Sequence, residues 1–208
     1  MKTLVAIPCG DTVPADTLQS VICLRVESPV QFTLIRGSLV YDARNRLAEI
    51  AMSGGFDRVL YLDSDMVFEP DMLTRFHGQL DEGKEVVCGL YTTRKPPIQT
   101  TLYSAMYLQQ EPGAKFSKPV LERMEGYPLD RPFKVKGCGF AGVMLTVDVL
   151  RRITETFGAP FSPLPGFGED LSFCLRAADL GIDIWCDPRI RFGHVGAVVY
   201  YPEKEEDA

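Results

Sequence analysis

The chain has 208 residues, and its 28 acidic and 22 basic side chains give a formal net charge of −6. This length suits one domain with a sizeable core, and the acidic balance argues against non-specific binding to polynucleotides, whose affinity comes largely from displaced counterions. Six cysteines without a Cys-x-x-Cys pair favour free thiols. Neither a secretory h-region nor a run of about 18 apolar residues is found, so a cytoplasmic protein without a transmembrane segment is expected.

Short apolar runs and amphipathic stretches alternate along most of the chain. Apolar runs bounded by turn residues predict strands, and apolar residues at helical spacing predict the helices between them. The predicted strands are Thr3–Pro8, Gln31–Ile35, Val59–Leu62, Glu85–Leu90 and Ile182–Cys186. The predicted helices are Pro14–Leu24, Gly37–Ser53, Met72–Leu80, Val147–Thr156 and Leu171–Gly181. This order predicts an α/β fold in a single domain, with a mostly parallel sheet and helices on both faces.

The alternation of predicted strands and helices stops beyond Tyr91, where the chain has six prolines up to and including Pro132. Between Arg94 and Lys136 there are eight basic and four acidic residues. Long irregular segments in compact domains are often functional, and this cationic one could face an anionic ligand or acceptor. Ordinary solvated lysines on a loop-rich surface are the alternative.

A glycine-rich stretch, Gly137–Gly142, then leads into an apolar strand that ends at Thr146. Glycine lets the backbone approach a ligand closely, which makes Gly139 and Phe140 candidate donor or acceptor contacts. Tight packing of the strand is the alternative explanation.

Two aspartates, Asp63 and Asp65, end the apolar run Val59–Leu62. Residues two apart on an extended chain project to the same side, so both carboxylates should face the crevice beyond the strand. Two like charges ~4 Å apart repel by roughly 4 kcal/mol at an effective dielectric of 20. Mg²⁺ or Mn²⁺ would reverse that sign, because hard cations take oxygen ligands and bridge phosphates. The pair predicts a metal–diphosphate site; a helix-capping turn before Asp71 is the alternative.

Three later residues could complete such a site. Glu169 and Asp170 stand at a predicted helix start, where acids are often mere caps. A helix N-terminus also keeps a carboxylate ionised and ready to accept a proton. His194 lies between glycines at a strand exit, where its imidazole could join the aspartates around a metal.

Five motifs occur in a fixed order along the chain: Ala43–Leu47, Gly55–Asp65, Gly168–Arg176, Gly181–Pro188 and Gly193–Gly196. This ordered set resembles the GT-A (Rossmann-like) fold of nucleotide-sugar glycosyltransferases, most closely glycosyltransferase family 2, over nearly the whole chain. The resemblance implies a domain over residues 1–202, with a nucleotide-binding half up to about 93, an acceptor and catalytic half from about 94, and an acidic tail at 203–208.

The resemblance also implies roles for individual residues. Asp65 would be a direct metal ligand, Asp63 would touch the ribose or the metal, and His194 would complete the metal shell. Asp170 would deprotonate the acceptor hydroxyl, as in inverting members, and Glu169 would contact donor sugar or acceptor. The residues expected to border the nucleotide are Pro8, Cys9, Gly10, Arg36, Arg44, Asn45, Asp63 and Ser64.

One departure concerns the nucleobase. Many relatives carry an aspartate just after the second strand, whereas Arg36 stands here, and it could meet phosphate, guanine or nothing. The base preference therefore stays open. Arg36–Ser38 and Arg44–Asn45 also resemble small retaining enzymes of this fold, so the stereochemical outcome stays open too.

The expected function is Mn²⁺- or Mg²⁺-dependent transfer of a sugar from a nucleoside-diphosphate sugar, with UDP ranked above GDP, to an unidentified acceptor hydroxyl. The acceptor could be anionic: a phosphorylated lipid, an acidic sugar or nucleic acid, including a modified DNA base. A nucleotidyltransferase is one alternative, although the turn Cys9–Thr12 lacks the lysine of a phosphate loop. A non-catalytic nucleotide-sugar or carbohydrate-binding domain is the other.

Overall fold

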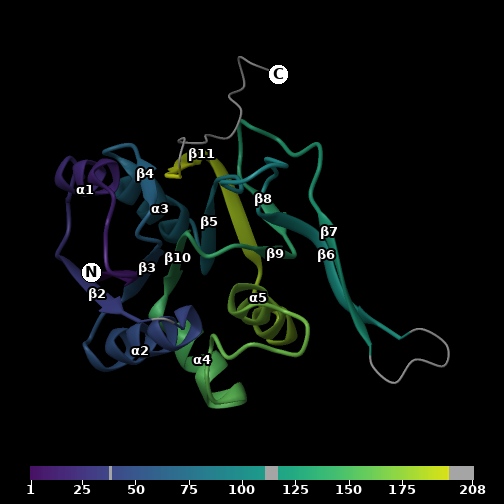
Figure 1. Cartoon of the computed structure of the whole chain (residues 1–208). Helices are drawn as coiled ribbons and strands as arrows, with labels where there is room; N and C mark the ends of the chain where they lie inside the picture. Colours follow the sequence, from purple (N-terminus) through teal and green to yellow (C-terminus); the bar gives the residue numbers. More distant parts are fainter. Residues whose placement is uncertain (38, 111–116, 197–208) are drawn as a thin grey trace.

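The computed structural model describes residues 1–37, 39–110 and 117–196. Its helices are α1 (Ala15–Ile22), α2 (Val40–Ser53), α3 (Met72–Asp81), α4 (Val147–Phe157) and α5 (Glu169–Asp179). The strands of its main sheet are β1 (Thr3–Cys9), β2 (Val30–Arg36), β3 (Arg58–Leu62), β4 (Met66–Phe68), β5 (Val86–Leu90), β8 (Phe133–Val135), β10 (Gly142–Thr146) and β11 (Ile184–His194). Figure 1 shows their arrangement. Ser38, the predicted acidic tail and residues 111–116 of the proline-rich cationic segment, which include Glu111, Pro112 and Lys115, lie outside the described residues.

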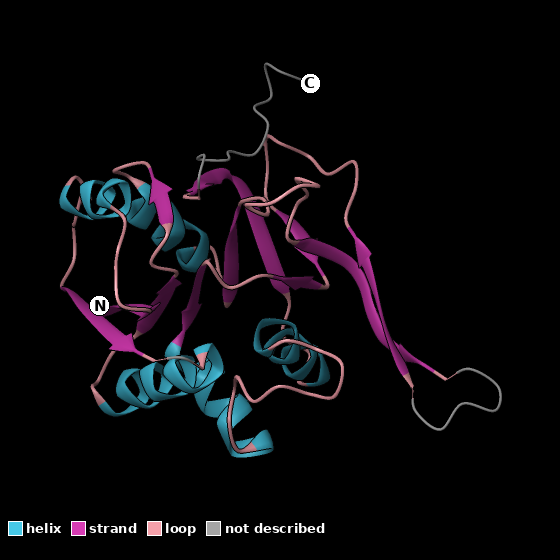
Figure 2. Ribbon diagram, viewed as in Figure 1, coloured by secondary structure: helices cyan, strands magenta, loops and turns pink. Residues whose placement is uncertain are grey.

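Helices cover both faces of the main sheet, as the sequence predicts (Figure 2). Successive strand residues point to opposite faces, so β1 sends Leu4 into one core and Val5 into the other. The first core also contains residues of α2, α4 and α5, and the second contains residues of α3 with Val21 of α1 packed against it. Strands buried on both faces read as continuous apolar runs, which is why they are visible in the sequence.

The sheet is mixed, which corrects the expectation of a mostly parallel sheet. Its strand order is β2-β1-β3-β10-β5-β11-β4, with β8 also paired to β11. The pairs β1–β2, β1–β3 and β5–β11 are parallel, but β10 is antiparallel to both of its neighbours, β3 and β5. β4 and β8 are antiparallel to β11. An apolar run predicts a strand but not its direction, which here depends on a distant connection.

That connection explains the direction of β10. The chain leaves β5 at the carboxyl edge of the sheet and returns beside the end of β3, where the Asp63 N–H donates to the Ala141 carbonyl over 3.0 Å. Since β10 starts at this edge, it must run back against its neighbours. Strands from both predicted halves of the chain thus share one sheet.

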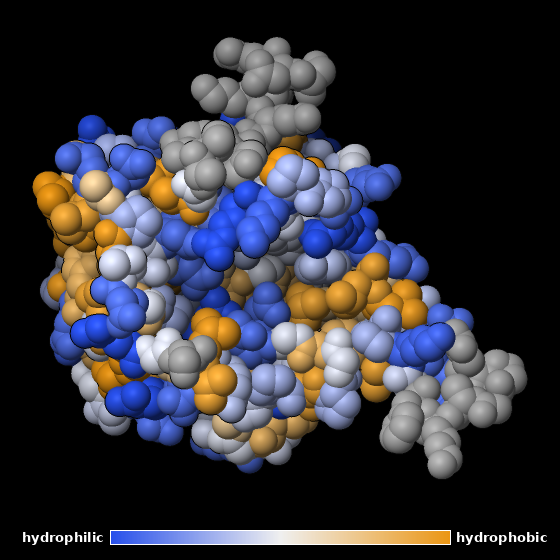
Figure 3. All heavy atoms as spheres, in the orientation of Figure 1, coloured by the Kyte–Doolittle hydropathy of each residue, from blue (hydrophilic) through white to orange (hydrophobic). Residues whose placement is uncertain are grey.

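The proline-rich segment contributes two strands to a second, three-stranded sheet rather than forming an irregular loop, and the third strand lies in the glycine-rich stretch. Its strands are β6 (Leu102–Gln109), β7 (Lys118–Arg123) and β9 (Gly137–Cys138), in the order β7-β6-β9. Pro119 lies in β7, an edge strand, where a residue without an N–H donor is tolerated. The β6–β7 hairpin projects from the body in Figure 1, and Figure 3 shows apolar residues gathered over it.

Five strands end at the same edge of the main sheet. β1, β2 and β3 are parallel, and the antiparallel β10 between β3 and β5 makes β5 and β11 run in their direction too. In sheets covered by helices, ligands bind in the crevice beyond the carboxyl ends of the strands. The residues that follow these five strands therefore define where a site is to be sought.

All six cysteines are free, and five of them are buried. Burial raises the pKa of Cys174 well above its ordinary value, as is typical of unreactive core thiols. Among the described helices, none combines the length and apolar character that crossing a membrane requires.

Candidate functional site

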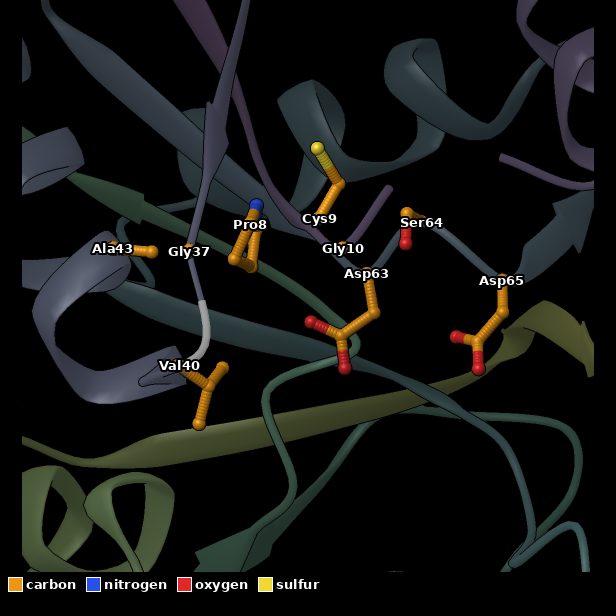
Figure 4. Close-up of a pocket in the computed structure, with 9 residues that line it drawn as sticks. All are labelled: Pro8, Cys9, Gly10, Gly37, Val40, Ala43, Asp63, Ser64 and Asp65. Carbon is orange, nitrogen blue, oxygen red and sulfur yellow. The ribbon is translucent and has the colours of Figure 1, made fainter. Parts of the chain in front are cut away.

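A cleft opens at the carboxyl edge of β1, β2 and β3 (Figure 4). It is lined by Pro8, Cys9, Gly10, Gly37, Val40, Ala43, Asp63, Ser64 and Asp65. The carboxylates of Asp63 and Asp65 extend from the same side of the chain, as their spacing predicts. No atom lies within 4 Å of where a Cβ would stand on Gly10 or Gly37, so the two glycines border open space.

Asp63 is held by a buried arginine. Arg44, only 3% exposed, donates from Nη2 to Asp63 Oδ1 over 2.8 Å and from Nη1 to Glu169 Oε1. It therefore joins the end of β3 to the start of α5, and the Phe140 ring lies 5.8 Å from its guanidinium carbon. Burial raises the pKa of Asp63, although the Arg44 charge acts in the opposite direction.

Asp65 has two different partners, one of which the sequence predicts. β4 directly follows Asp65 and pairs with the end of β11, where His194 is opposite Met66. This pairing places His194 Nε2 3.3 Å from Asp65 Oδ2. Arg94 Nη1 lies 2.5 Å from the same oxygen. Burial alone would raise the pKa of Asp65, but the hydrogen bond with His194 and the charges of His194 and Arg94 lower it.

The other ring nitrogen of His194 fixes its tautomer. Nδ1 lies 3.0 Å from the carbonyl oxygen of Thr92, and a carbonyl can only accept, so Nδ1 carries a proton. The hydrogen bond from Nε2 to Asp65 therefore needs a second proton on the ring, and loss of that proton would leave a lone pair on Nε2 that could take a cation. A backbone carbonyl on the far nitrogen is the usual support of a metal-binding imidazole.

Two of the three predicted metal ligands, Asp65 and His194, lie together, whereas the third, Asp63, is turned to Arg44. Among the residues described, no three His, Cys, Asp or Glu side chains form a metal-binding group. Two donors 3.3 Å apart, each about 2.1 Å from a shared ion, subtend an angle of about 100°. This angle is close to octahedral or tetrahedral geometry. Mg²⁺ uses few protein ligands and keeps waters and substrate phosphate oxygens, so the pair fits such an ion.

The two acids of α5 differ in their attachments. Glu169 is held by Arg44, whereas Asp170 Oδ1 accepts a hydrogen bond of 2.7 Å from the Leu171 N–H. Burial and the Glu169 charge raise the pKa of Asp170. A Cβ on Gly168 would lie 2.9 Å from Asp170 Oδ1, so glycine leaves room for that carboxylate.

Four other predicted residues have partners within the protein. The exposed Arg36 pairs with Asp11 over 2.5 Å, and Asn45 Oδ1 accepts from the Phe161 N–H over 2.9 Å. Phe140 is 1% exposed and packs edge-on against Tyr61, Phe161 and Phe173. A Cβ on Gly139 would collide with the Tyr91 hydroxyl. Tight packing therefore accounts for the glycine at 139.

Sequence reasoning assigns no individual role to Arg94 or Thr92, although both contact the site. They follow β5, whose carboxyl end lies at the same edge as that of β3. The carboxyl-end rule, applied to this strand as it is to β3, is the signal that could have found them.

Of the comparisons with known proteins, the one with solved structures finds a likeness, and that likeness concerns the fold alone. No protein-family model matches the chain, and no curated protein matches it. Among 273 matching chains of solved structures is the crystal structure of A197 from STIV, with a TM-score of 0.64 and 18% sequence identity. The match covers 94% of this chain and 86% of that one. Fold and site together define an α/β protein with an acidic cleft at the carboxyl edge of a mixed sheet, and function must be argued from that cleft.

Proposed function

We propose that this chain is a cation-dependent glycosyltransferase of the GT-A fold, which transfers a sugar from a nucleoside-diphosphate sugar to an acceptor hydroxyl. The supporting observation is that three acidic or imidazole-bearing motifs, far apart in sequence, converge on one edge of the sheet. Asp63 is joined to Glu169 through Arg44, and Asp65 contacts His194 directly. UDP is preferred over GDP because of the family resemblance alone.

Each part of the cleft has a task in this reaction. The turn after β1 and the open space at Gly37 would take the nucleoside. Asp65 and His194 would hold Mn²⁺ or Mg²⁺, which when bound supplies positive charge beside the leaving diphosphate. Asp63, fixed by Arg44, would accept hydrogen bonds from the donor. The low exposure of Arg44 makes it a positioning residue rather than a ligand contact.

Asp170 is the group best suited to accept the proton. Glu169 is paired with Arg44, whereas the hydrogen bond that Asp170 accepts among the described residues comes from the backbone of its own helix turn. Its raised pKa makes Asp170 a stronger base than an ordinary carboxylate. The acceptor oxygen bonds to the anomeric carbon, the bond from that carbon to the diphosphate breaks, and the hydroxyl proton goes to Asp170. A base on the acceptor side corresponds to inversion at that carbon.

Donor hydrolysis distinguishes this function from its rivals. The protein is incubated with UDP- and GDP-sugars and Mn²⁺ without acceptor, and the phosphate product is identified by mass spectrometry. A glycosyltransferase releases the nucleoside diphosphate and free sugar, because water replaces the acceptor. A nucleotidyltransferase would break a different phosphate bond, and a non-catalytic domain would release nothing; either result would contradict the proposal.

Two variants separate donor binding from transfer. Asp65→Asn should lose Mn²⁺-dependent donor binding. Asp170→Asn should bind the donor as the wild type does, while its turnover falls by about 10²- to 10⁴-fold, the usual contribution of a general base. Full turnover in Asp170→Asn would show that the base lies elsewhere.

A further inference from the structure

The segment after β5 forms a small loop that is closed by its own hydrogen bonds. Thr92 pairs with Thr100, and the Thr93 N–H donates to the Gln99 carbonyl over 2.9 Å. The Thr93 hydroxyl donates to the Pro97 carbonyl over 3.0 Å and accepts from the Gln99 N–H over 3.1 Å. The loop thus holds the backbone on both sides of Arg94.

This loop contacts the Asp65–His194 pair at two points. The Thr92 carbonyl accepts from His194 Nδ1, and Arg94 Nη1 lies 2.5 Å from Asp65 Oδ2. The same Oδ2 faces His194 Nε2 at 3.3 Å. One carboxylate oxygen is therefore shared between an imidazole and a guanidinium, and the guanidinium supplies the positive charge that an incoming ion would supply.

The Arg94–Asp65 pair is also suited to exchange. The Arg94 side chain is 51% exposed, against 3% for Arg44 on the neighbouring aspartate. Exposed ion pairs contribute little net free energy, because water competes for both charges. A guanidinium also binds phosphate oxygens with two parallel hydrogen bonds, so Arg94 has a second partner in any diphosphate bound at this edge.

We propose that Arg94 is a built-in counter-ion: it neutralises Asp65 in the free protein and moves to the donor diphosphate when a divalent cation takes its place. This rests on the proposed function, since it assumes a cation and a diphosphate at this edge. It assigns Arg94 two opposite effects, competition with the free cation and attraction of the anionic donor.

The first effect is measured with Mn²⁺ alone, by electron paramagnetic resonance of the free ion. Arg94→Gln should bind Mn²⁺ about three- to tenfold more tightly than the wild type, because no ion pair must be broken. Lys95→Gln is the matched control, since it removes one positive charge from the next residue, which is exposed as well. It should change Mn²⁺ affinity by less than about twofold. Unchanged melting temperatures show that both variants are folded.

The second effect is measured by calorimetry with UDP and GDP at saturating Mn²⁺. Arg94→Gln should bind the nucleotide about tenfold more weakly, and Lys95→Gln should stay within about twofold of the wild type. The proposal is overturned if Arg94→Gln does not raise Mn²⁺ affinity, if it does not weaken nucleotide binding, or if Lys95→Gln does the same. Equal Mn²⁺ binding by the wild type, Arg94→Gln and Lys95→Gln would overturn the role of Arg94 but not the proposed function. A folded wild-type protein that binds no Mn²⁺ would contradict the cation in both proposals.

Discussion

Two aspartates of one motif are neutralised by arginines in opposite environments. Asp63 is paired with Arg44, which is 3% exposed and also holds Glu169. Asp65 is paired with Arg94, which is 51% exposed. The expected repulsion between the two carboxylates is thus relieved by a separate cation on each. The buried Arg44–Asp63 pair therefore stabilises the fold, whereas in the exposed Arg94–Asp65 pair each partner can be replaced by a ligand.

The positions of the two arginines explain the difference. Arg44 lies on the same buried face of α2 as Ala48 and Ala51, between the helix and the sheet. Arg94 lies on a surface loop beyond β5. The buried charge of Arg44 is tolerated only because opposite charges compensate it. At the exposed Arg94, water can replace a lost partner.

Removal of each arginine should give the largest contrast between the two pairs. Arg44→Met leaves two carboxylates without their buried partner and should lower the free energy of unfolding by about 3–5 kcal/mol. Arg94→Met should lower it by less than about 1 kcal/mol. Urea denaturation measures both.

A triple variant is the control for this contrast. Arg44→Met combined with Asp63→Asn and Glu169→Gln removes the charges together and should recover most of the lost stability. Equal costs for Arg44→Met and Arg94→Met would contradict the division into a fixed and an exchangeable pair.

Gly168→Ala tests the freedom of Asp170 relative to the tethered Glu169. The added Cβ would lie 2.9 Å from Asp170 Oδ1, so that carboxylate must move. Because small displacements of a catalytic group are costly, donor turnover should fall by about ten- to a hundredfold while nucleotide affinity stays unchanged. Steady-state kinetics and calorimetry measure the two quantities.

Gly78→Ala is the matched substitution. Gly78 lies in α3 with no atom within 4 Å of a Cβ, so alanine should keep full turnover and stabilise the helix by about 0.5–1 kcal/mol. Equal losses in both variants would show that turnover does not depend on the position of Asp170.

The smallest expected effect is the pH dependence of stability that comes from Asp65 and its neighbour His194. The lowered pKa of Asp65 gives stability that is present above its unfolded value of about 3.9 and is lost as the pH falls. Burial acts to lower the pKa of His194, but Asp65 and Thr92 raise it, so its contribution is present below about 6.5 and is lost as the pH rises.

Asp65→Asn removes both contributions. Its free energy of unfolding should differ most from that of the wild type between about pH 4 and 6.5, by about 1 kcal/mol or less. Denaturation at low salt across this range measures the difference. A difference that does not vary with pH would mean that the interactions of the Asp65 charge with Arg94 and His194 contribute nothing to stability.

Much of the fold can be read from the sequence where structure is local. The apolar runs predict the parallel strands, although β11 continues to His194, well beyond the predicted end at Cys186. Helical spacing predicts five helices at nearly their observed bounds. The direction of β10 depends on where a distant segment returns to the sheet. The three-residue β4 exists only because β11 pairs with it. The β6–β7 hairpin is hidden by prolines that an edge strand tolerates.

In the candidate site, too, the sequence predicts some residues and not others. Asp63 and Asp65 follow a strand, His194 ends one, and Glu169 and Asp170 open a helix, so position in the chain marks these residues. Their partners are set by tertiary packing. Nothing local shows that Arg44 spans two acids or that the Thr92 carbonyl orients His194. Phe140 sits in a glycine-rich stretch that suggests a ligand contact, yet its ring fills the core.

The most direct test of the central claim is calorimetric titration of the wild-type chain with UDP, GDP, dTDP and CDP, each with and without Mn²⁺. A glycosyltransferase that holds its donor through a cation on Asp65 and His194 should bind at least one of these nucleotides much more tightly with Mn²⁺, and Asp65→Asn should abolish the difference. Failure of all four to bind in a Mn²⁺-dependent way, with the protein folded, would contradict it.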